Sequence, residues 1–195
     1  MESANAIVGR CFDEHLELLA LVRQQHYLIE DIAASWCSAI KAGCKLMLCG
    51  NGGSAADSQH IAAELVGRFQ SNRAALPAIA LTTDTSALTA IGNDFGFEQV
   101  FSRQVQALGL PNDILVMFST SGNSENLIQA AAAAASRGCQ TLAILGGDGG
   151  RLGKVVDKSI IVPSRNTARI QEMHILIGHI LCELLETQLE EGGSL

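Results

Sequence analysis

The sequence predicts a single-domain α/β protein built on a parallel β-sheet with helices on both faces. Five short apolar runs alternate with helical stretches, and the runs occupy residues 45–49, 78–82, 114–118, 141–145 and 159–162. Continuous apolar strands of this kind are typical of a parallel sheet that is covered on both faces. Since neither an internal repeat nor a linker interrupts the pattern, residues 1–195 are expected to form one domain.

Residues 1–43 precede the first predicted strand and are expected to form a helical segment. They contain no proline, and apolar side chains such as Val8 and Phe12 recur at helical spacing up to Gly43. One long helix or two in sequence would satisfy this pattern. Because the segment lies outside the α/β core, we expect it to pack against another subunit. The alternative is that it covers the protein's own sheet.

The first apolar run leads into a glycine turn and then into a helix that is predicted from Ser54 to about Gln70. The turn reads Asn51-Gly52-Gly53, and the order strand, glycine turn, helix is the layout of an α/β phosphate site. On the helix, His60 and Glu64 are four residues apart. They therefore share a face and could share a metal ion or a proton.

The second apolar run is followed by a helical segment over residues 85–108. Within it, Gly92-Asn93-Asp94-Phe95-Gly96 is predicted to be a polar turn, because asparagine, aspartate and glycine are ordinary turn formers. On spacing alone, a structural role is favoured for Asn93 and Asp94.

The third apolar run ends in Ser119-Thr120-Ser121-Gly122-Asn123-Ser124, and an alanine-rich helix follows to about Arg137. Hydroxyls and backbone N–H groups at a helix N-terminus beyond a strand's carboxyl end suit a phosphate. The alternative is a Ser/Thr helix cap with a turn glycine. Two such strand ends in one chain favour the phosphate interpretation. Neither loop has a GK[ST] or GxGxxG pattern, so nucleotide binding is disfavoured.

The fourth run leads into residues 146–150, which are predicted to be a flexible turn, and the fifth precedes a final helix over residues 168–190. Gln171 and His179 lie eight positions apart on this helix, about 12 Å along its axis. One metal ion could join both only if the side chains lean together or come from different subunits. His174 is predicted to be a core residue, since a lone histidine on an apolar helix is more often core than ligand.

The composition favours a folded protein and argues against several classes of partner. Hydrophobic residues make up 48% and charged residues 17%, with a formal net charge of −7 and no basic run. Nucleic acid is therefore not an expected partner, and a phosphorylated substrate would have to be held by local donors. The six cysteines have no CxxC spacing, and no apolar run reaches the ~20 residues of a membrane span. A reduced, cytoplasmic protein without membrane association is expected.

Several motifs together resemble one family. They are CGNGGS at 49–54, His60-x-x-x-Glu64, PAIALT at 77–82, GNDFG at 92–96, FSRQV at 101–105, STSGNS at 119–124, and RIQEMH at 169–174 with His179. In this order, and over about residues 40–185, the sequence resembles the bacterial phosphoheptose isomerases (sedoheptulose 7-phosphate isomerases) of the sugar-isomerase (SIS) fold. The serine-rich loop alone marks only the wider fold, whereas Glu64 and His179 together narrow the resemblance to the isomerase.

The resemblance implies a five-stranded parallel sheet in a three-layer α-β-α sandwich of flavodoxin-like type, extended by the N-terminal helical segment. It also implies a homotetramer with active sites at subunit contacts, and catalytic roles for Glu64 and His179. One Zn²⁺ per subunit would be held by His60, Glu64, Gln171 and His179. The substrate-binding residues that it implies are Asn51, Gly52, Gly53, Ser54, Glu64, Asn93, Asp94, Ser119, Thr120, Ser121, Ser124 and Gln171.

The implied reaction converts D-sedoheptulose 7-phosphate into D-glycero-D-manno-heptose 7-phosphate, the first step of ADP-heptose biosynthesis for lipopolysaccharide. A proton moves from C1 to C2 through an enediol, so the reaction needs a base and an acid. Glu64 would take the C1 proton, and His179 would donate or relay one.

Two alternative functions remain open. One is a non-catalytic adaptor, because a relative that binds the replication initiator protein shares the segment at 168–174. That relative lacks counterparts of Glu64 and His179, which this chain retains. The other is an isomerase for a different phosphosugar, since the length of the sugar is read by the shape of the pocket. Ala168 is a minor departure from the family pattern, because other members have an aspartate before the Arg-Ile-Gln-Glu motif but some members lack it too.

Overall fold

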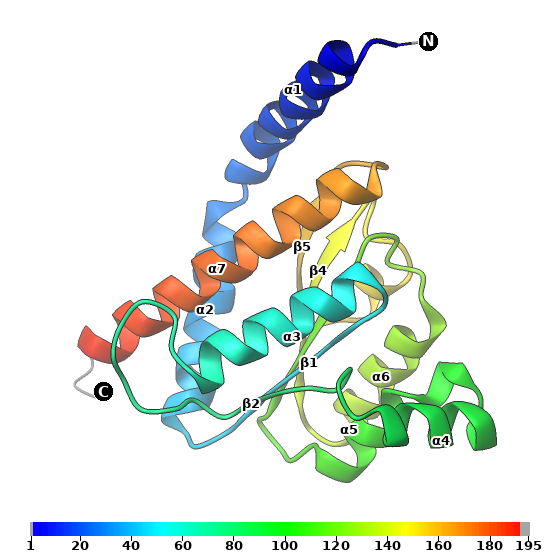
Figure 1. The fold of residues 1–195 in the computed structure, drawn as a ribbon. Coiled ribbons are helices and arrows are strands. Elements are labelled where there is room, and N and C mark those ends of the chain that lie inside the picture. The colour runs from blue at the N-terminus through cyan, green and yellow to red at the C-terminus, as the bar shows by residue number, and fades with distance from the viewer. Residues whose placement is uncertain (1, 192–195) are drawn as a thin grey trace.

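The computed structural model describes residues 2–191, and its strands form a five-stranded parallel sheet (Figure 1). The strand order is β2-β1-β3-β4-β5, and every neighbouring pair is parallel. The strands are β1 (Leu46–Gly50), β2 (Ala78–Ala80), β3 (Ile114–Ser119), β4 (Gln140–Gly146) and β5 (Lys158–Val162). All five predicted apolar runs thus contain strands, which confirms the α/β class.

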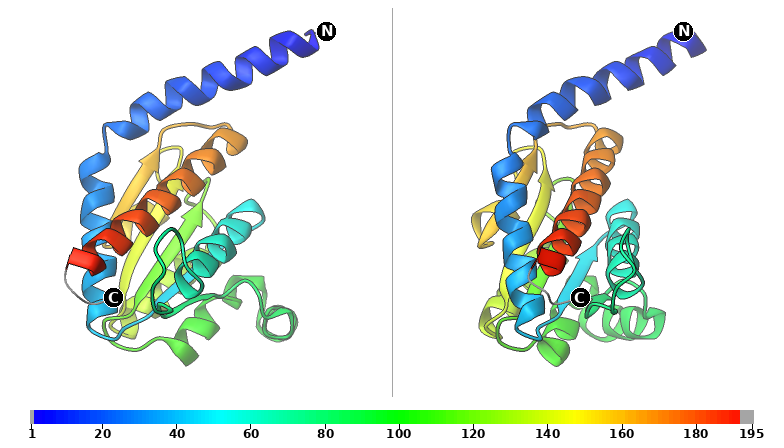
Figure 2. Two further views of the ribbon diagram at one scale, coloured as in Figure 1. Left: turned by 60° about the vertical axis from the view of Figure 1, so that its left-hand side comes forward. Right: turned by 90° about the vertical axis from the view of Figure 1, so that its left-hand side faces the viewer.

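Helices cover both faces of the sheet and complete a three-layer sandwich (Figure 2). One face carries α2 (His26–Lys41), α3 (Gly53–Val66) and α7 (Thr167–Glu191), and the other carries α5 (Ser102–Leu108) and α6 (Glu125–Ser136). Successive residues of β1 point to opposite cores, as the period of a strand requires. Leu46 and Leu48 pack on the α7 side, and Met47 and Cys49 pack on the α6 side.

The N-terminal segment forms two helices, α1 (Ala4–Arg23) and α2. α2 ends before Gly43, whose φ of +78° favours glycine, and it buries Trp36 completely. α1 projects from the body of the protein (Figures 1 and 2). Several of its large apolar side chains are exposed: Ile7, Val8, Phe12 and Leu16. α2 therefore covers the chain's own core, while α1 presents an apolar surface, and its part in oligomerisation stays a prediction.

The predicted polar turn at residues 92–96 is wrong, because residues up to Phe95 belong to α4 (Thr85–Phe95). The Asp84 carboxylate caps this helix by accepting a hydrogen bond from the Ala87 N–H at 2.9 Å. Leu88 and Ile91 pack against the core and hold the helix in place. It ends at Phe95, and its C-cap Gly96, which has a φ of +91°, precedes the short 3₁₀ helix η1 (Phe97–Gln99).

α3 also differs from the prediction, because it ends at Val66 and not near Gln70. Gly67 follows as its C-cap, and the chain then turns into a loop that returns to β2. A second 3₁₀ helix, η2 (Leu152–Lys154), follows the turn after β4. None of the helices in residues 2–191 combines the length and the apolarity that crossing a bilayer requires.

Candidate active site

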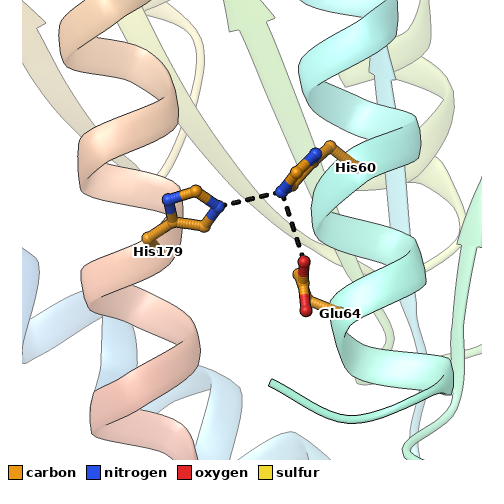
Figure 3. Close-up of side chains that lie close together, drawn as sticks. All are labelled: His60, Glu64 and His179. Atoms are coloured by element: carbon orange, nitrogen blue, oxygen red, sulfur yellow. Dashed lines mark hydrogen bonds and ion pairs between the residues drawn. The ribbon is translucent and has the colours of Figure 1, made fainter. Parts of the chain in front are cut away.

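Three side chains with metal-binding atoms meet between α3 and α7 (Figure 3). α3 contributes His60 and Glu64, and α7 contributes His179. The Nε2 atoms of His60 and His179 are 2.9 Å apart, and His60 Nε2 is 3.2 Å from Glu64 Oε1. The expected His60–Glu64 pair therefore forms, and the fold adds His179 from 119 residues further along the chain.

Close packing of α3 on α7 brings this cluster together. Gly178 lies against Ile61, and a Cβ at position 178 would come within 2.6 Å of Ile61 Cδ1. A glycine is what permits the two helices to approach this closely. His60 is next to Ile61 in the sequence, and His179 is next to Gly178. The two histidines consequently face each other across the helix interface.

The donor atoms of the cluster fit one divalent metal ion. One ligand atom from each of the three side chains lies within 4.8 Å of the other two. Zinc ligands lie about 2.0–2.2 Å from the ion, so two ligands on one tetrahedral ion are about 3.4 Å apart. The observed separations of 2.9 and 3.2 Å are close to that value. Three protein ligands are also typical of catalytic zinc sites, which keep one position open.

The fourth expected ligand, Gln171, lies beside the glycine turn. A Cβ at Gly53 would come within 2.3 Å of Gln171 Nε2, so the amide packs directly on the backbone at the start of α3. Gly53 is seven residues before His60, which is about 10 Å along a helix. The structure thus groups Gln171 with the expected substrate loop, and its role as a metal ligand stays a prediction.

The two loops that are expected to hold a sugar phosphate are joined by a pair of amides. Asn51 Nδ2 donates to Asn126 Oδ1 at 3.0 Å, and Asn126 Nδ2 donates to Asn51 Oδ1 at 2.9 Å. Gly52, the N-cap residue of α3, has a φ of +56°, which favours glycine, and Ser54 in the first turn of α3 is buried. Sequence reasoning missed Asn126, although it follows the serine-rich loop by two residues.

The serine-rich loop between β3 and α6 is organised around its own backbone. Ser119 Oγ accepts a hydrogen bond from the Gly122 N–H at 3.0 Å, and Ser121 Oγ accepts one from Asn123 at 3.1 Å. Ser124 is the N-cap residue of α6, yet its side chain makes no capping hydrogen bond within the described residues. The simple-cap alternative therefore does not apply to Ser124, and a helix N-terminus with such a hydroxyl suits an anion.

The turn at residues 146–150 supports the serine-rich loop. A Cβ at Gly122 would come within 2.0 Å of the Gly149 carbonyl oxygen, so the two backbones are in direct contact. The Leu152 N–H also donates to the Gly122 carbonyl at 2.8 Å. The expectation of a merely flexible turn is corrected, because its glycines let one backbone pack on another.

Asn93 and Asp94 lie on a different helix from the His60, Glu64 and His179 cluster of the same chain. Both are exposed in the last turn of α4, where Asn93 Nδ2 donates to Asp94 Oδ1 at 2.7 Å. Figure 1 shows α4 well separated from α7. Their expected contact with substrate therefore stays a prediction.

Asp57 is a titratable residue near the cluster that sequence reasoning missed. It precedes His60 by three residues on α3, and its Oδ2 atom is buried without a hydrogen-bond partner among the described residues. Burial raises the pKa of Asp57 to about 6, although the charge of His60 opposes this shift. The helical spacing from His60 is the signal that could have found it.

His174 is a core residue, as predicted. Its side chain is fully buried beside Phe118, with the ring centroids 6.1 Å apart. Neither ring nitrogen has a hydrogen-bond partner within residues 2–191. Burial lowers the pKa of His174 to about 4, and the nearby Leu145 backbone opposes only part of this shift. The folded protein thus keeps this histidine neutral at pH 7.

We expect this histidine to destabilise the protein as the pH falls from about 6.5 to about 4. The unfolded chain gains the proton near pH 6.5 and the folded chain only near pH 4, so the unfolded state binds more protons in between. The expected loss is about 3 kcal/mol. Urea unfolding at pH 7 and pH 4.5 should show a smaller loss for His174→Phe, whereas exposed His26→Phe should match the wild type. An undiminished loss in His174→Phe would contradict the expectation.

Comparisons with known proteins identify the family of the chain. Residues 12–146 match the family model of the SIS domain. The chain is 52% identical to the phosphoheptose isomerase of Aquifex aeolicus, over 94% of this chain and 97% of that protein. It is 63% identical to the phosphoheptose isomerase of Nitratiruptor sp., over 76% of this chain and 79% of that protein.

Solved structures lead to the same family. The phosphoheptose isomerase of Neisseria gonorrhoeae has a TM-score of 0.90 at 43% identity, covering 95% of this chain and 100% of its own. That of Francisella tularensis has a TM-score of 0.92 at 36% identity, covering 95% and 99%. The fold and the matched domain define an SIS-domain protein, and the named relatives place it among the enzymes of this class. Within this class, the chain belongs to the phosphoheptose isomerase family.

Proposed function

We propose that the chain isomerises D-sedoheptulose 7-phosphate to D-glycero-D-manno-heptose 7-phosphate. The observation that carries this proposal is the meeting of Glu64 with His60 and His179 between α3 and α7. The names and the 52% and 63% identities of the relatives support a seven-carbon sugar phosphate as substrate. The proposed product is the starting point of ADP-heptose biosynthesis for lipopolysaccharide.

Glu64 and His179 are the proposed proton-transfer residues. The C1 proton of the ketose passes to Glu64, the C2 carbonyl becomes a hydroxyl, the C1 hydroxyl becomes the aldehyde, and a proton returns to C2. The Glu64 side chain is 26% exposed, so its carboxylate is accessible to a bound sugar. His179 approaches from the opposite helix and would donate or relay a proton at the sugar oxygens.

The donor set fits zinc, with His60, Glu64 and His179 as ligands and Gln171 as the proposed fourth. When bound, zinc would act as a Lewis acid and stabilise negative charge on O1 and O2. Gln171 would have to leave Gly53 to join the other three. Glu64 would have to loosen from ligation to accept a proton, because ligation makes a carboxylate a weaker base.

The sugar phosphate is proposed to bind along the loops joined by the Asn51–Asn126 amides. The serine-rich loop would hold the phosphate, and the glycine turn would hold the sugar backbone. Neutral donors of this kind suit an acidic chain with a net charge of −7. The proposed contacts are Asn51, Gly52, Gly53, Ser54, Glu64, Ser119, Thr120, Ser121, Ser124 and Gln171.

We further propose a cytoplasmic homotetramer in which subunits complete one another's sites. The exposed apolar residues of α1 support assembly, because large contiguous apolar patches are unusual on the surface of monomers. Asn93 and Asp94 are exposed and apart from the cluster of their own chain. They would therefore contact the substrate of a neighbouring subunit.

Incubation with sedoheptulose 7-phosphate tests the proposal. Aldose product should form, disappear when a chelator removes the metal, and return when zinc is added. kcat/KM should be higher for the seven-carbon substrate than for five- and six-carbon ketose phosphates. Absence of aldose product under every metal condition would contradict the proposal and favour the adaptor alternative, whereas a higher value for a shorter ketose would favour another phosphosugar.

A further inference from the structure

One face of the His179 imidazole is covered by an aromatic ring from the loop that follows α3. The rings of Phe69 and His179 are nearly parallel, with centroids 5.5 Å apart and an interplanar angle of 22°. Phe69 belongs to residues 67–77, a loop that Figure 1 shows running past the C-terminal part of α7. Offset stacking of this kind restrains the orientation of a ring.

A buried carboxylate on α7 anchors this loop. The Glu186 oxygens accept hydrogen bonds from three successive backbone N–H groups, those of Phe69 (3.0 Å), Gln70 (3.0 Å) and Ser71 (2.8 Å). Successive N–H groups that converge in this way form a concave anion site. The Glu186 side chain is only 4% exposed, so these bonds are shielded from water. Glu186 therefore holds Phe69 in place through the backbone N–H of Phe69.

Arg73 completes the anchor and connects it to α3. Its Nε donates to Glu186 Oε1 at 2.8 Å, and its side chain is fully buried. Its two terminal nitrogens donate to the carbonyls of Leu65 and Glu64, each at 2.9 Å. These carbonyls lie in the last turn of α3, where helical partners are lacking. Arg73 thus ties the end of the helix that carries His60 and Glu64 to the helix that carries His179.

The charge state of the anchor is secure at neutral pH. Burial alone would raise the pKa of Glu186, but the three backbone donors and Arg73 together hold that pKa below its ordinary value. Glu186 is therefore ionised whenever the enzyme works near neutral pH. Near neutral pH, the ionised Glu186 keeps both its ionic contact with Arg73 and its hydrogen bonds to the loop.

We propose that Phe69 is a positioning residue that fixes the plane of the His179 imidazole, and that Glu186 and Arg73 hold the loop that places it there. The inference rests on the proposed function, because it assigns Phe69 to the histidine that binds metal and moves a proton. With its ring restrained, His179 keeps Nε2 directed at His60. Without the stack, the imidazole can rotate. Part of the free energy of zinc binding is then lost in restoring the orientation of the ring.

Phe69→Leu tests this role, because leucine fills space but cannot stack. Zinc affinity, measured by competition with a chromogenic chelator, should fall about tenfold, as for other residues that orient a metal ligand. kcat should fall while KM for sedoheptulose 7-phosphate changes little, since the phosphate loops are untouched. Phe69→Tyr keeps the ring and should restore both values. Tyr27→Leu is the matched control, because Tyr27 is an exposed aromatic residue on α2.

Two outcomes would overturn the inference. In the first, Phe69→Leu binds zinc and turns over like the wild type, which leaves the proposed function intact and removes the positioning role. In the second, Phe69→Tyr is as impaired as Phe69→Leu, which shows that ring stacking is not the cause. If Phe69→Leu does not fold by circular dichroism, Phe69→Met takes its place. Failure of the wild type to bind zinc or to turn over would instead contradict the proposed function.

Discussion

Replacing Glu64 with glutamine is expected to remove turnover while the fold stays intact. The amide is nearly the size of the carboxylate but cannot accept the C1 proton, and positioned acid–base groups typically contribute about 10²–10⁴-fold to rate. The fold should tolerate the change, because Glu64 is partly exposed and its close ionic partner is His60. Steady-state kcat with sedoheptulose 7-phosphate measures the effect, and urea unfolding confirms that the protein remains folded.

The matched control for this prediction is Glu183→Gln. Glu183 is also a helical glutamate, but it is exposed on α7 and is not part of the cluster. Its replacement should leave kcat near that of the wild type. Undiminished turnover by Glu64→Gln would end the assignment of Glu64 as the base.

The second large effect is expected for stability and comes from Glu186→Ala. The substitution removes the acceptor of three partly buried backbone N–H groups and the carboxylate partner of the buried Arg73 guanidinium, which keeps its carbonyl acceptors in α3. Removing one member of a buried ion pair typically costs about 3–5 kcal/mol. The free energy of urea unfolding at pH 7 measures the loss.

Glu125→Ala controls for loss of a salt bridge in general. Glu125 pairs with Arg151 on the surface, where the two side chains are 49% and 61% exposed. Because exposed pairs contribute about 0–1 kcal/mol, this variant should unfold at nearly the wild-type urea concentration. Equal destabilisation by the two substitutions would show that the buried anchor is no stronger than a surface contact.

The sequence predicts the strands better than the site, for a physical reason. Each strand lies in an apolar run, and the central strands are buried on both faces, as in Leu46–Gly50, whereas the edge strands β2 and β5 are only partly buried. The His60–Glu64 pair is equally local, because helical spacing alone puts both on one face. The place of His179 depends on the contact between Gly178 and Ile61, which local spacing does not contain.

Two features could not be predicted from local sequence: the helix over residues 92–95 and the contacts of Phe69 and Arg73 with α7. Both depend on contacts between segments that are distant in the sequence. Residues 92–95 contain turn-forming types, but the Asp84 cap and the packing of Leu88 keep them helical. Phe69 and Arg73 belong to a loop without periodicity, so no pattern connects them to α7. Glu186 did leave a signal, since it is a charged residue between the buried Leu185 and Leu189 on an apolar helix face.

The close contact between Gly178 and Ile61 links the spacing of the His60, Glu64 and His179 side chains to the packing of α3 on α7. These side chains are carried by two packed helices, which meet closely where the Gly178 backbone contacts the Ile61 side chain. Flexible side chains alone would let such a cluster adjust to ions of many sizes. Here, the positions of the three side chains are also constrained by how closely α3 and α7 pack, and a glycine of α7 lies at that contact.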